Sequence, residues 1–277
     1  METNNYYEKD ILYNLVTFLN TSSSEEMFYT ICYNILTHID EIPTINILDL
    51  AKMCYTSPAT ISRFCRHLKF ANFAEFKNEV SDSLNMARNE IKLSGSSLVE
   101  AYQNPQSCID LIYDTSIRSL QMSKENLRIE DVDRLCQILH DAKKIHFFGF
   151  QFNKIVASDF QIKLLKLGKL AYAFADRGDD AQRIELLDHD SLAIVLSSRA
   201  RDLQMFSLVD AIKTRKSRVV LVTMNKDAKV IDKVDDAFVV DGMINDIFES
   251  STSETTVIKT FLDLVYFRYG ILYPRKG

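Results

Sequence analysis

The first part of the chain shows apolar residues at helical spacing. In the run from Tyr7 to Asp40 they recur three or four positions apart, and a polar stretch from Thr21 to Ser24 divides them into two groups. Ser24 is suited to cap the second group, because its hydroxyl can accept a hydrogen bond from a backbone N–H of the first turn. The pattern therefore predicts two amphipathic helices in this region.

The second half of the chain changes to short apolar runs that alternate with helical patterns, such as Asn153 to Leu167 and Leu203 to Lys216. Runs enriched in Val, Ile and Phe are typical of strands that are buried on both faces of a parallel sheet. We expect an all-α first domain and an α/β second domain, with a five-stranded parallel sheet flanked by helices. The predicted strands are residues 144–150, 169–175, 191–197, 218–224 and 236–241.

A stretch of weak periodicity separates the two halves. Residues 91–108 contain Gly95, a cluster of serines and a proline, all of which interrupt helices or mark loops. The predicted organisation is a helical domain of residues 1–90, a linker and connecting helix of residues 91–127, and a second domain of residues 128–277.

Composition fits a division into two domains. The chain has 277 residues, of which 47% are hydrophobic, and this is enough for two separate cores. Its apolar runs are shorter than the roughly 20 residues that span a bilayer, and its first ten residues lack the basic and then apolar order of a signal peptide. We therefore expect a cytoplasmic protein without a membrane partner.

Five cysteines are spread along the chain without C-x-x-C spacing or a neighbouring histidine pair. An odd number at wide spacing argues against a disulfide framework and against a zinc site. We expect small apolar core residues and no metal. The cysteines are Cys32, Cys54, Cys65, Cys108 and Cys136.

The net charge of -5 argues at first against a nucleic-acid partner. The distribution of charge changes that picture, because residues 1–49 carry eight acids and one base, whereas residues 50–74 carry no acid. The bases of this second segment are Lys52, Arg63, Arg66 and Lys69. A small basic segment thus lies within an acidic half of the chain.

That basic segment has the pattern of two short helices joined by a turn. The first helix is predicted from Ile47 to Cys54, and the second begins after Ser57, which can cap it, with Pro58 in the first helical position. The second helix has one apolar stripe at helical spacing, and its remaining side chains are short, polar or basic. The stripe consists of Ile61, Phe64, Cys65 and Leu68.

Two such helices form the helix-turn-helix that places its second helix in the major groove of DNA. The start of that helix would reach base edges, while backbone N–H groups, hydroxyls and cations would bind phosphates. On these residues alone, a helical hairpin with a solvated polar face is the alternative. The residues predicted to contact DNA are Ser57, Ala59, Thr60, Ser62, Arg63, Arg66, His67 and Lys69.

The same segment resembles the N-terminal domain of the RpiR family of bacterial regulators. The family has an L-A pair, then S-x-x-T-I-x-R-F-C-x-x-L-x-F, then F-x-x-F-K, and this chain carries these residues at fixed spacing from Leu50 to Lys77. Two positions differ, because Lys69 stands where the family usually has glycine and Thr56 where it usually has an aliphatic residue. The resemblance implies a transcription regulator that binds double-stranded DNA.

The resemblance also implies a C-terminal sugar isomerase (SIS) domain over roughly residues 128–270, which in this family binds phosphosugars or related anionic metabolites. Two loops would build its pocket, and the first, normally G-x-G-x-S, here has Gln151 and Asn153 in place of the second glycine and the serine. The residues implied in effector binding are Gly149, Gln151, Asn153, Ser197, Ser198, Arg199 and Arg201.

The second loop, normally S-x-S-G-x-T, departs further from the family. Arg199 replaces its second serine, Ala200 its glycine and Asp202 its threonine. The aspartate would repel a phosphate, whereas the two arginines can bind a phosphate or a carboxylate, or can pair with Asp202 or with a partner subunit. Three interpretations follow: a site for a different anion, a phosphosugar site with substituted contacts, or a site that has lost its ligand and serves assembly.

An isomerase is the main alternative to a regulator, since SIS domains also occur in aldose-ketose isomerases. The acid-base candidates show no paired motif, so no catalytic residue is assigned. The chain has only seven glycines, and the glycine-rich nucleotide loops are absent from it, so no cofactor is expected. The candidates for acid-base chemistry are His140, His146, His189, Glu185 and Glu249.

A protein whose N-terminal domain only dimerises is the second alternative. The helix predicted from Ser253 to Tyr269 is apolar on more than one face. It is therefore expected to pack both on the sheet and against a second subunit, as related SIS domains do. A homodimer or homotetramer of this kind would place two recognition helices in successive major grooves of a near-palindromic operator.

Overall fold

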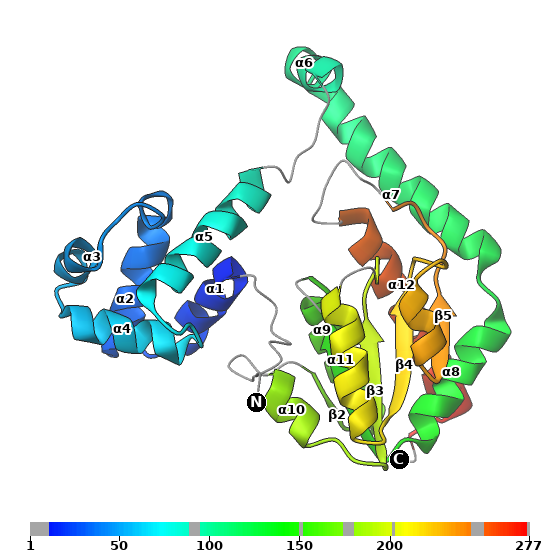
Figure 1. Ribbon diagram of the computed structural model, residues 1–277. Helices are drawn as coiled ribbons and strands as arrows, with labels where there is room; N and C mark the ends of the chain where they lie inside the picture. Colours follow the sequence, from blue (N-terminus) through cyan, green and yellow to red (C-terminus); the bar gives the residue numbers. More distant parts are fainter. Residues whose placement is uncertain are drawn as a thin grey trace. The chain divides into compact units, whose positions relative to one another are not determined.

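The computed structural model of the chain describes residues 11–88, 95–149, 152–173, 180–200, 203–244 and 252–275. These residues form two compact units, one within residues 8–90 and the other within residues 91–277 (Figure 1). Each unit has its own hydrophobic core. No helix among the described residues is long and apolar enough to cross a bilayer.

The N-terminal unit is helical, as predicted. Its fully buried side chains come from the inward faces of successive helices, for example Leu15, Ile35, Phe64 and Phe76. The two helices expected from the periodicity before Asp40 are present. The described elements are α1 (Ile11–Thr21), α2 (Met27–Thr37), the 3-10 helix η1 (Ile39–Glu41), α3 (Ile47–Met53), α4 (Pro58–His67) and α5 (Phe73–Arg88).

The start of α2 differs from the prediction. Glu26, not Ser24, stands at the N-cap, and its side chain makes no capping hydrogen bond. The polar residues form a turn instead, in which Ser23 accepts the N–H of Glu26 at 3.0 Å on its carbonyl and the N–H of Glu25 at 3.4 Å on its hydroxyl. This turn uses the hydrogen-bonding groups before the helix, which therefore begins at Met27.

The C-terminal unit contains the predicted five-stranded parallel sheet, with strand order β2-β1-β3-β4-β5. β2 is shorter than expected, because only Ala171 and Tyr172 pair with β1. The strands are β1 (Lys144–Gly149), β2 (Ala171–Tyr172), β3 (Ser191–Leu196), β4 (Arg218–Thr223) and β5 (Asp236–Val239). The other elements are α6 (Gly95–Gln103), α7 (Gln106–Asn126), α8 (Ile129–Asp141), α9 (Phe152–Lys166), α10 (Asp180–Glu185), α11 (Leu203–Thr214), η2 (Lys229–Lys233) and α12 (Thr252–Leu272).

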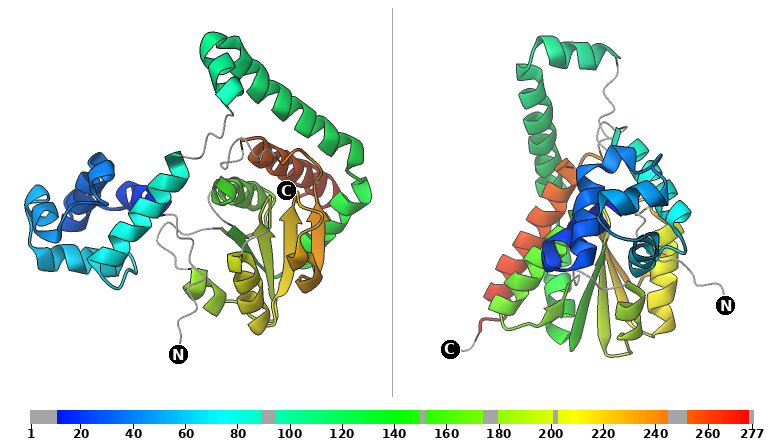
Figure 2. Two further views of the ribbon diagram at one scale, coloured as in Figure 1. Left: turned by 45° about the horizontal axis from the view of Figure 1, so that its top comes forward. Right: turned by 90° about the vertical axis from the view of Figure 1, so that its left-hand side faces the viewer.

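Helices cover both faces of this sheet. Alternate residues of each strand point to opposite faces, so Phe147 packs with α8, α9 and α12, whereas Phe148 packs with α10 and α11. The right-hand view of Figure 2 shows the sheet between these two layers. β3 is buried along its length, and β1 and β4 are buried from their second residue on, which explains why these strands are mostly apolar rather than alternating.

The segment predicted as a linker and connecting helix forms α6 and α7, and α7 packs along α12. Ser119 of α7 is fully buried, and its hydroxyl accepts the backbone N–H of Met243 at 2.9 Å. A side chain on Gly242 would approach that hydroxyl to 2.8 Å, so the backbone after β5 runs very close to α7. α7 is thus fixed to the sheet domain by packing and by a buried hydrogen bond.

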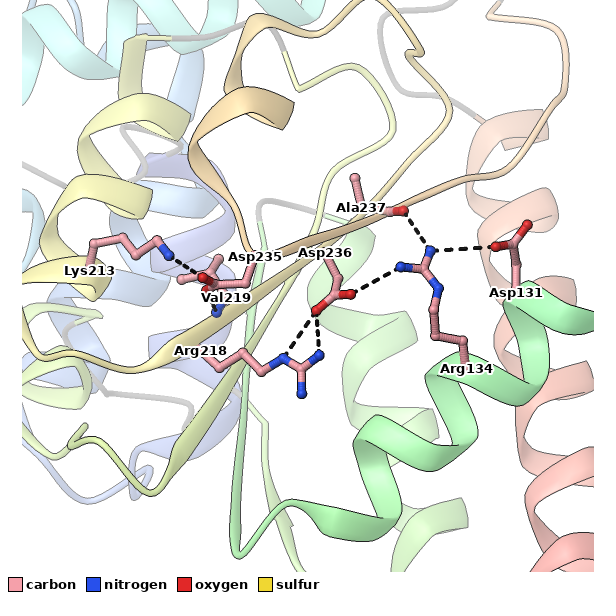
Figure 3. A network of polar contacts seen from close by, with 8 residues as sticks. All are labelled: Asp131, Arg134, Lys213, Arg218, Val219, Asp235, Asp236 and Ala237. Carbon is pink, nitrogen blue, oxygen red and sulfur yellow. Dashed lines mark hydrogen bonds and ion pairs between the residues drawn. The ribbon is translucent and has the colours of Figure 1, made fainter.

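Charged side chains hold α8 against the starts of β4 and β5 (Figure 3). Asp236, the first residue of β5, accepts hydrogen bonds from Arg218 at 2.7 and 3.1 Å and from Arg134 of α8 at 3.0 Å. The guanidinium of Arg134 also lies over the ring of Phe238, 4.4 Å from its centre. One carboxylate therefore joins two strands and a helix at the amino ends of the strands.

Asp235, also drawn in Figure 3, connects α11 to the same end of the sheet. It accepts hydrogen bonds from Lys213 at 2.6 Å and from the backbone N–H of Val219 at 2.7 Å. Burial raises the pKa of this carboxyl, but the two hydrogen bonds and the nearby positive charges outweigh it, so the pKa lies below its usual value. Asp235 therefore finds its hydrogen-bond donors within the sheet domain.

Four of the five cysteines are buried as predicted, and the prediction for Cys108 is wrong, because it is exposed on α7. Cys108 falls where α7 has no buried neighbour, since the apolar contacts of that helix begin further along. Burial raises the pKa of the Cys54 thiol to about 11. It raises the pKa values of Cys32, Cys65 and Cys136 to about 12.

Candidate DNA-contacting helix and effector site

The turn between α3 and α4 is a helix C-cap closed by two backbone hydrogen bonds. The N–H of Thr56 donates to the carbonyl of Ala51 at 2.8 Å, and the N–H of Tyr55 donates to that of Lys52 at 3.0 Å. Tyr55 takes the left-handed conformation that this motif requires, with φ of 51°. The chain therefore reverses within a few residues, and Thr56, which is not the family's usual aliphatic residue, donates the closing bond.

The start of α4 is specified as the sequence predicts. The Ser57 hydroxyl accepts the backbone N–H of Thr60 at 3.2 Å, and Pro58 occupies the first turn. The side-chain hydroxyls of Ser57 and Thr60 are also 2.9 Å apart. Because the first turn is fixed by side chains as well as by the proline ring, its exposed N–H groups have a defined direction.

The inner face of α4 is the predicted apolar stripe. Ile61, Phe64 and Cys65 are fully buried. The ring of Phe64 packs edge-on against the rings of Phe18 and Phe28, at 5.7 and 5.5 Å between centres. This packing fixes the rotation of α4 about its axis, and so determines which side chains face outward.

The outer face of α4 presents most of the residues predicted to contact DNA. Ser62 is half-buried and donates to the carbonyl of Pro58 at 3.0 Å. Thr60, expected on this face, is only 8% exposed, because it lies one turn before Phe64 and faces the core. The exposed residues are Ser57, Ala59, Arg63, Arg66, His67 and Lys69.

The buried hydroxyl of Thr60 accepts a hydrogen bond from the guanidinium of Arg63 at 3.2 Å. Thr60 therefore orients Arg63 instead of facing solvent. Within the part of the chain that the structure describes, Arg63, Arg66 and Lys69 form no ion pair. By contrast, Lys52 of α3 pairs with Asp49 at 3.0 Å.

The end of α4 keeps a left-handed residue where the family usually has glycine. Lys69 has φ of 70°. The N–H of Phe70 donates to the carbonyl of Cys65, and the N–H of Lys69 to that of Arg66, both at 3.0 Å. The substitution therefore leaves the turn geometry intact and adds a cation next to the outer face.

The effector site was predicted at the carboxyl ends of β1 and β3. In the order β2-β1-β3-β4-β5 the direction of strand addition reverses between these two strands, which is where open α/β sheets bind ligands. Gly149 ends β1 opposite Leu196, the last residue of β3. A side chain on Gly149 would approach the Leu196 carbonyl oxygen to 2.8 Å, so glycine is required where the two loops begin.

Residues 150–151, which connect β1 to α9 and include the predicted site residue Gln151, lie outside the described residues. Asn153 stands in the first turn of α9, close to Gly149. A Cβ atom added at Gly149 would lie 3.2 Å from the Cβ of Asn153. Its side-chain Oδ1 is buried and accepts no hydrogen bond from the residues that the structure describes. The amide at this position therefore faces inward near the strand end.

The loop after β3 is held by hydrogen bonds within the unit. The Ser197 hydroxyl accepts the N–H of Ala200 at 3.1 Å, and Ala200 is left-handed with φ of 46°, again where the family has glycine. Ser198 is buried, and its carbonyl accepts the Thr223 hydroxyl at 3.1 Å. The Asn225 side chain donates to the carbonyl of Arg199 at 2.7 Å.

The side chain of Arg199 forms an ion pair with Glu254 of α12. Its Nη2 and Nε lie 3.1 and 3.3 Å from Oε1 of Glu254, whose side chain is 1% exposed. Glu254 was not among the partners, Asp202 or a second subunit, that the sequence suggested for this arginine. Arg201 and Asp202 lie outside the described residues.

Glu254 was missed in the sequence because nothing local connects it to the loop, from which it is separated by 55 residues. The available signal was a single acidic residue in the first turn of a helix that is otherwise apolar on the side facing the sheet. This acidic residue in the first turn of α12 is therefore the signal in the sequence for a partner of Arg199.

The histidines proposed for acid-base chemistry lie apart. His146 is buried and stacks on Tyr172, with 4.9 Å between ring centres; burial, and then the charges of Arg183 and Lys144, lower its pKa to about 4. His140 stacks on Tyr273 at 3.7 Å between ring centres. Among the described residues, no group of three or more His, Cys, Asp and Glu side chains could hold a metal ion.

His189 is exposed, Glu185 is exposed at the end of α10, and Glu249 lies outside the described residues. The described members of the set therefore come from different elements and form no shared cluster.

Comparison with known proteins agrees with both units. The helix-turn-helix domain of the rpiR family matches residues 22–87, and the SIS domain matches residues 138–264. The chain belongs to the RpiR family. The first match includes the whole of α2, α3 and α4, and the second includes both ends of the candidate effector site, so both candidate sites of this RpiR-family protein lie within matched regions.

Two curated relatives illustrate the similarity. This RpiR-family chain is 20% identical over 242 residues to an uncharacterized HTH-type transcriptional regulator of Clostridium perfringens, covering 86% of this chain and 84% of that one. It is 23% identical over 192 residues to the bifunctional protein glk of Burkholderia thailandensis, covering 68% of this chain. The match covers only 29% of that relative, so the chain spans about three tenths of its length.

Among solved structures, this RpiR-family fold is similar to that of the Vibrio vulnificus NanR protein complexed with ManNAc-6P. The TM-score is 0.55 at 18% sequence identity, and the match covers 96% of this chain and 93% of that one. The similarity extends over both units and supports the assignment of an all-α domain followed by an SIS-like α/β domain.

Proposed function

We propose that this chain is a transcription regulator that binds operator DNA through α4 and responds to a phosphorylated sugar or a related anionic metabolite bound by its SIS domain. The observation that carries the proposal is the outer face of α4, where Arg63, Arg66 and Lys69 are exposed and unpaired among the described residues. A basic face on the second helix of a helix-turn-helix is what major-groove binding requires.

The residues of α4 have distinct roles in this proposal. Ser57, Ala59 and Ser62 stand at the start of the helix, where side chains reach base edges. Arg63 is held by Thr60 at 3.2 Å, which suits a directed contact with a base or a phosphate.

Arg66, His67 and Lys69 follow further along, where they would bind phosphates and set the register of the protein on DNA. Thr60 itself supports Arg63 and does not touch DNA.

We further propose that the chain acts as a homodimer or homotetramer on a near-palindromic operator. Two copies of α4 would then enter successive major grooves, about 34 Å apart on one side of the duplex. Exposed apolar side chains on the sheet domain support assembly with a second copy, because large apolar residues at such positions are commonly covered. They include Ile162 and Leu165 of α9 and Phe267 and Ile271 of α12.

The effector class rests on the position of the two loops and on a relative. The loops after β1 and β3 flank the point where strand order reverses. NanR, whose fold is similar over 93% of its chain, was solved in complex with ManNAc-6P. An effector would alter DNA binding only if it binds the DNA-competent and the incompetent arrangements with different affinity.

We infer that the site does not catalyse isomerisation. A general base must reach the proton that it removes and must titrate near the working pH. His146 is buried and stacks on Tyr172, and its pKa is lowered to about 4. The imidazole of His140, on α8, stacks on the ring of Tyr273. Neither lies on the two loops of the candidate site.

The decisive experiment is a titration of the full-length protein against its own upstream DNA at several salt concentrations, with and without a panel of phosphosugars and sugar acids. A specific complex whose affinity falls with salt, and which one compound shifts, supports both parts of the proposal. A specific complex that no compound shifts leaves a regulator without an effector. Absence of any specific complex contradicts the proposal.

A further inference from the structure

The side chains of Arg63, Thr60 and Ser57 form a continuous chain of hydrogen bonds along the start of α4. Nη2 of Arg63 donates to the Thr60 hydroxyl at 3.2 Å, and the hydroxyl oxygens of Thr60 and Ser57 lie 2.9 Å apart. The Ser57 hydroxyl also accepts the backbone N–H of Thr60 at 3.2 Å. Because the three residues are spaced three positions apart, they are neighbours on the surface of the helix.

The link between Thr60 and Ser57 has one favourable direction. A guanidinium has donors and no acceptor, so the Thr60 oxygen must accept from Arg63. Thr60 is 8% exposed, and the only acceptor that its hydroxyl contacts among the described residues is the Ser57 oxygen. A buried hydroxyl proton without an acceptor is costly, so Thr60 donates to Ser57.

This direction determines what the start of α4 offers to a ligand. The Ser57 oxygen accepts from both the N–H and the hydroxyl of Thr60, which uses its two lone pairs. Ser57 is exposed, so its own proton points outward as a donor. The guanidinium of Arg63 also has donors only. At these two positions α4 therefore presents hydrogen-bond donors and no acceptor.

We infer that Arg63 reads a guanine in the major groove, and that Thr60 is the positioning residue that holds its guanidinium for this contact. The inference rests on the proposed function and names the base that α4 recognises at this position. Guanine presents two neighbouring acceptors, N7 and O6, whereas adenine presents one acceptor beside a donor, thymine one acceptor and cytosine a donor. A side chain that can only donate therefore matches guanine at both atoms and every other base less well.

The fixed position of Arg63 separates it from the other cations of this face. A phosphate can be approached from many directions, so a mobile cation binds it well. A bidentate contact with a base edge needs a guanidinium at a defined angle, and ordering a free side chain on binding weakens the complex. Among the described residues, Arg66 and Lys69 have no side-chain partner that would order them, so Arg63 is the arginine prepared for a directed contact.

The bond to Thr60 leaves enough of the guanidinium free for guanine. Nη2 carries two N–H groups, of which Thr60 takes one. The other, together with an N–H of Nη1, forms the fork that can donate to N7 and O6. The contact with Thr60 and the contact with the base can therefore exist together.

The first test selects binding sites for the full-length protein from a pool of random duplex DNA and identifies them by sequencing. We expect the wild type to require guanine at one position where Arg63→Ala accepts all four bases about equally. Replacing this guanine by 7-deazaguanine, which lacks the N7 acceptor, should weaken wild-type binding about tenfold in a fluorescence anisotropy titration. The same replacement should have no effect on Arg63→Ala.

The role of Thr60 is tested with Thr60→Val, which keeps the shape of the side chain and removes its hydroxyl. Its preference for guanine over adenine at that position should fall about fivefold, because Arg63 must then be ordered on binding. Affinity for a random duplex and its slope against salt should stay at the wild-type values. Thr60→Ser keeps the hydroxyl and should restore the preference, whereas a merely structural role would change specific and nonspecific binding together.

Ser62→Ala is the matched control. It removes a hydroxyl from the same helix, but this hydroxyl donates to the carbonyl of Pro58 at 3.0 Å and does not hold Arg63. The preference for guanine at the position read by Arg63 should stay within about twofold of the wild type. A loss equal to that of Thr60→Val would contradict the inference.

Two results would overturn the inference. One is a position that depends on Arg63 but carries a base other than guanine, and the other is a folded Thr60→Val that keeps the full preference. If Thr60→Val does not fold, Thr60→Ala decides instead, because it removes the same hydroxyl and adds no bulk beside Phe64. A wild type that selects no sequence contradicts the proposed function as a whole, whereas a selected sequence without a guanine that depends on Arg63 contradicts this inference alone.

Discussion

The turn after α4 and the loop after β3 are built from similar residues but present their arginines differently. Each contains a left-handed residue where the family usually has glycine, Lys69 in one and Ala200 in the other. Each carries arginine side chains next to that residue. On α4 the guanidiniums of Arg63 and Arg66 are exposed and form no ion pair among the described residues, whereas that of Arg199 is bound to buried Glu254.

The difference means that an arginine side chain in a loop is not always available to bind a phosphate, because another residue of the chain can already hold it. An exposed guanidinium has only loosely held water and counterions to release when it binds DNA. A guanidinium that supports a buried carboxylate can bind a ligand only if the ligand offers more than that carboxylate does. The first arrangement suits a long polyanion such as DNA.

The largest expected effect is on DNA binding by α4. Arg63→Ala combined with Arg66→Ala should weaken operator binding by roughly a hundredfold or more, because each lost base or phosphate contact costs about 1–3 kcal/mol. The slope of affinity against salt should also fall by about one for each lost phosphate contact. Both are measured by fluorescence anisotropy with operator DNA at several salt concentrations.

Lys52→Ala provides the control for this change in charge, since Lys52 already pairs with Asp49 on α3. It should weaken binding less than about threefold. Normal operator binding by the Arg63 and Arg66 double variant would show that α4 is not the reading helix. Circular dichroism and the thermal midpoint should be unchanged in both proteins, because all three side chains are exposed.

The next effect concerns the contribution of the Arg199–Glu254 ion pair to the stability of the sheet domain. Arg199→Ala removes an ion-pair partner of the buried Glu254 carboxylate and should lower the free energy of unfolding by about 3 kcal/mol. Glu254→Ala should cost less, because the Arg199 side chain is partly exposed and can turn to solvent. Urea unfolding followed by circular dichroism measures both, and equal losses would argue against a buried carboxylate that depends on Arg199.

Two histidines extend the contrast between exposed and enclosed groups. His67 is exposed on α4, whereas His146 is buried in β1, where burial and the charges of Arg183 and Lys144 lower its pKa from 6.5 to about 4. Between those values the unfolded chain binds a proton that the folded chain does not. The stabilising effect is therefore complete above pH 6.5 and is lost as the pH falls toward 4.

The expected loss is up to about 3 kcal/mol across this window. The free energy of unfolding of the sheet domain is measured by urea denaturation at a series of pH values. His146→Phe keeps an aromatic ring against Tyr172 but cannot titrate, so the slope attributable to His146 should disappear. A variant with the same slope as the wild type would show that other groups cause it.

The smallest effects are expected at the two left-handed positions. Lys69→Gly and Ala200→Gly should each raise the free energy of unfolding by about 1 kcal/mol, because glycine adopts positive φ without steric cost. Lys69→Ala is the control, since it removes the charge but keeps the strained conformation, and it should give no gain. Thermal unfolding measures the shifts, and a loss of stability in Lys69→Gly would contradict the account of the turn.

The fold was predictable wherever local pattern and tertiary contacts agree. The stripe of Ile61, Phe64 and Cys65 is buried as its spacing indicates, and the apolar runs became strands in a parallel sheet. The wrong predictions concern residues whose side chains could take either of two structural roles. Ser23 and Ser24 could cap a helix or form a turn, and Thr60 could face solvent or the core beside Phe64.

The candidate sites were predictable to different degrees for the same reason. The outer face of α4 is a local property of one helix, so its members follow from helical periodicity. The Arg199–Glu254 pair joins the loop after β3 to the start of α12, 55 residues further along the chain, and no spacing in the sequence indicates it. The assignment of Gln151 and Arg201 to the effector site stays a prediction, because both lie outside the described residues.

The distribution of thiols gives the wild-type chain a built-in position for a spectroscopic probe. Cys32, Cys54, Cys65 and Cys136 are buried with raised pKa values, so little thiolate forms there at neutral pH, while Cys108 is exposed on α7. A maleimide dye or a spin label should therefore attach at Cys108 without any substitution. The label would stand on the helix that follows the DNA-binding unit in sequence and packs along α12, and it could report on that helix in the native protein as ligands are added.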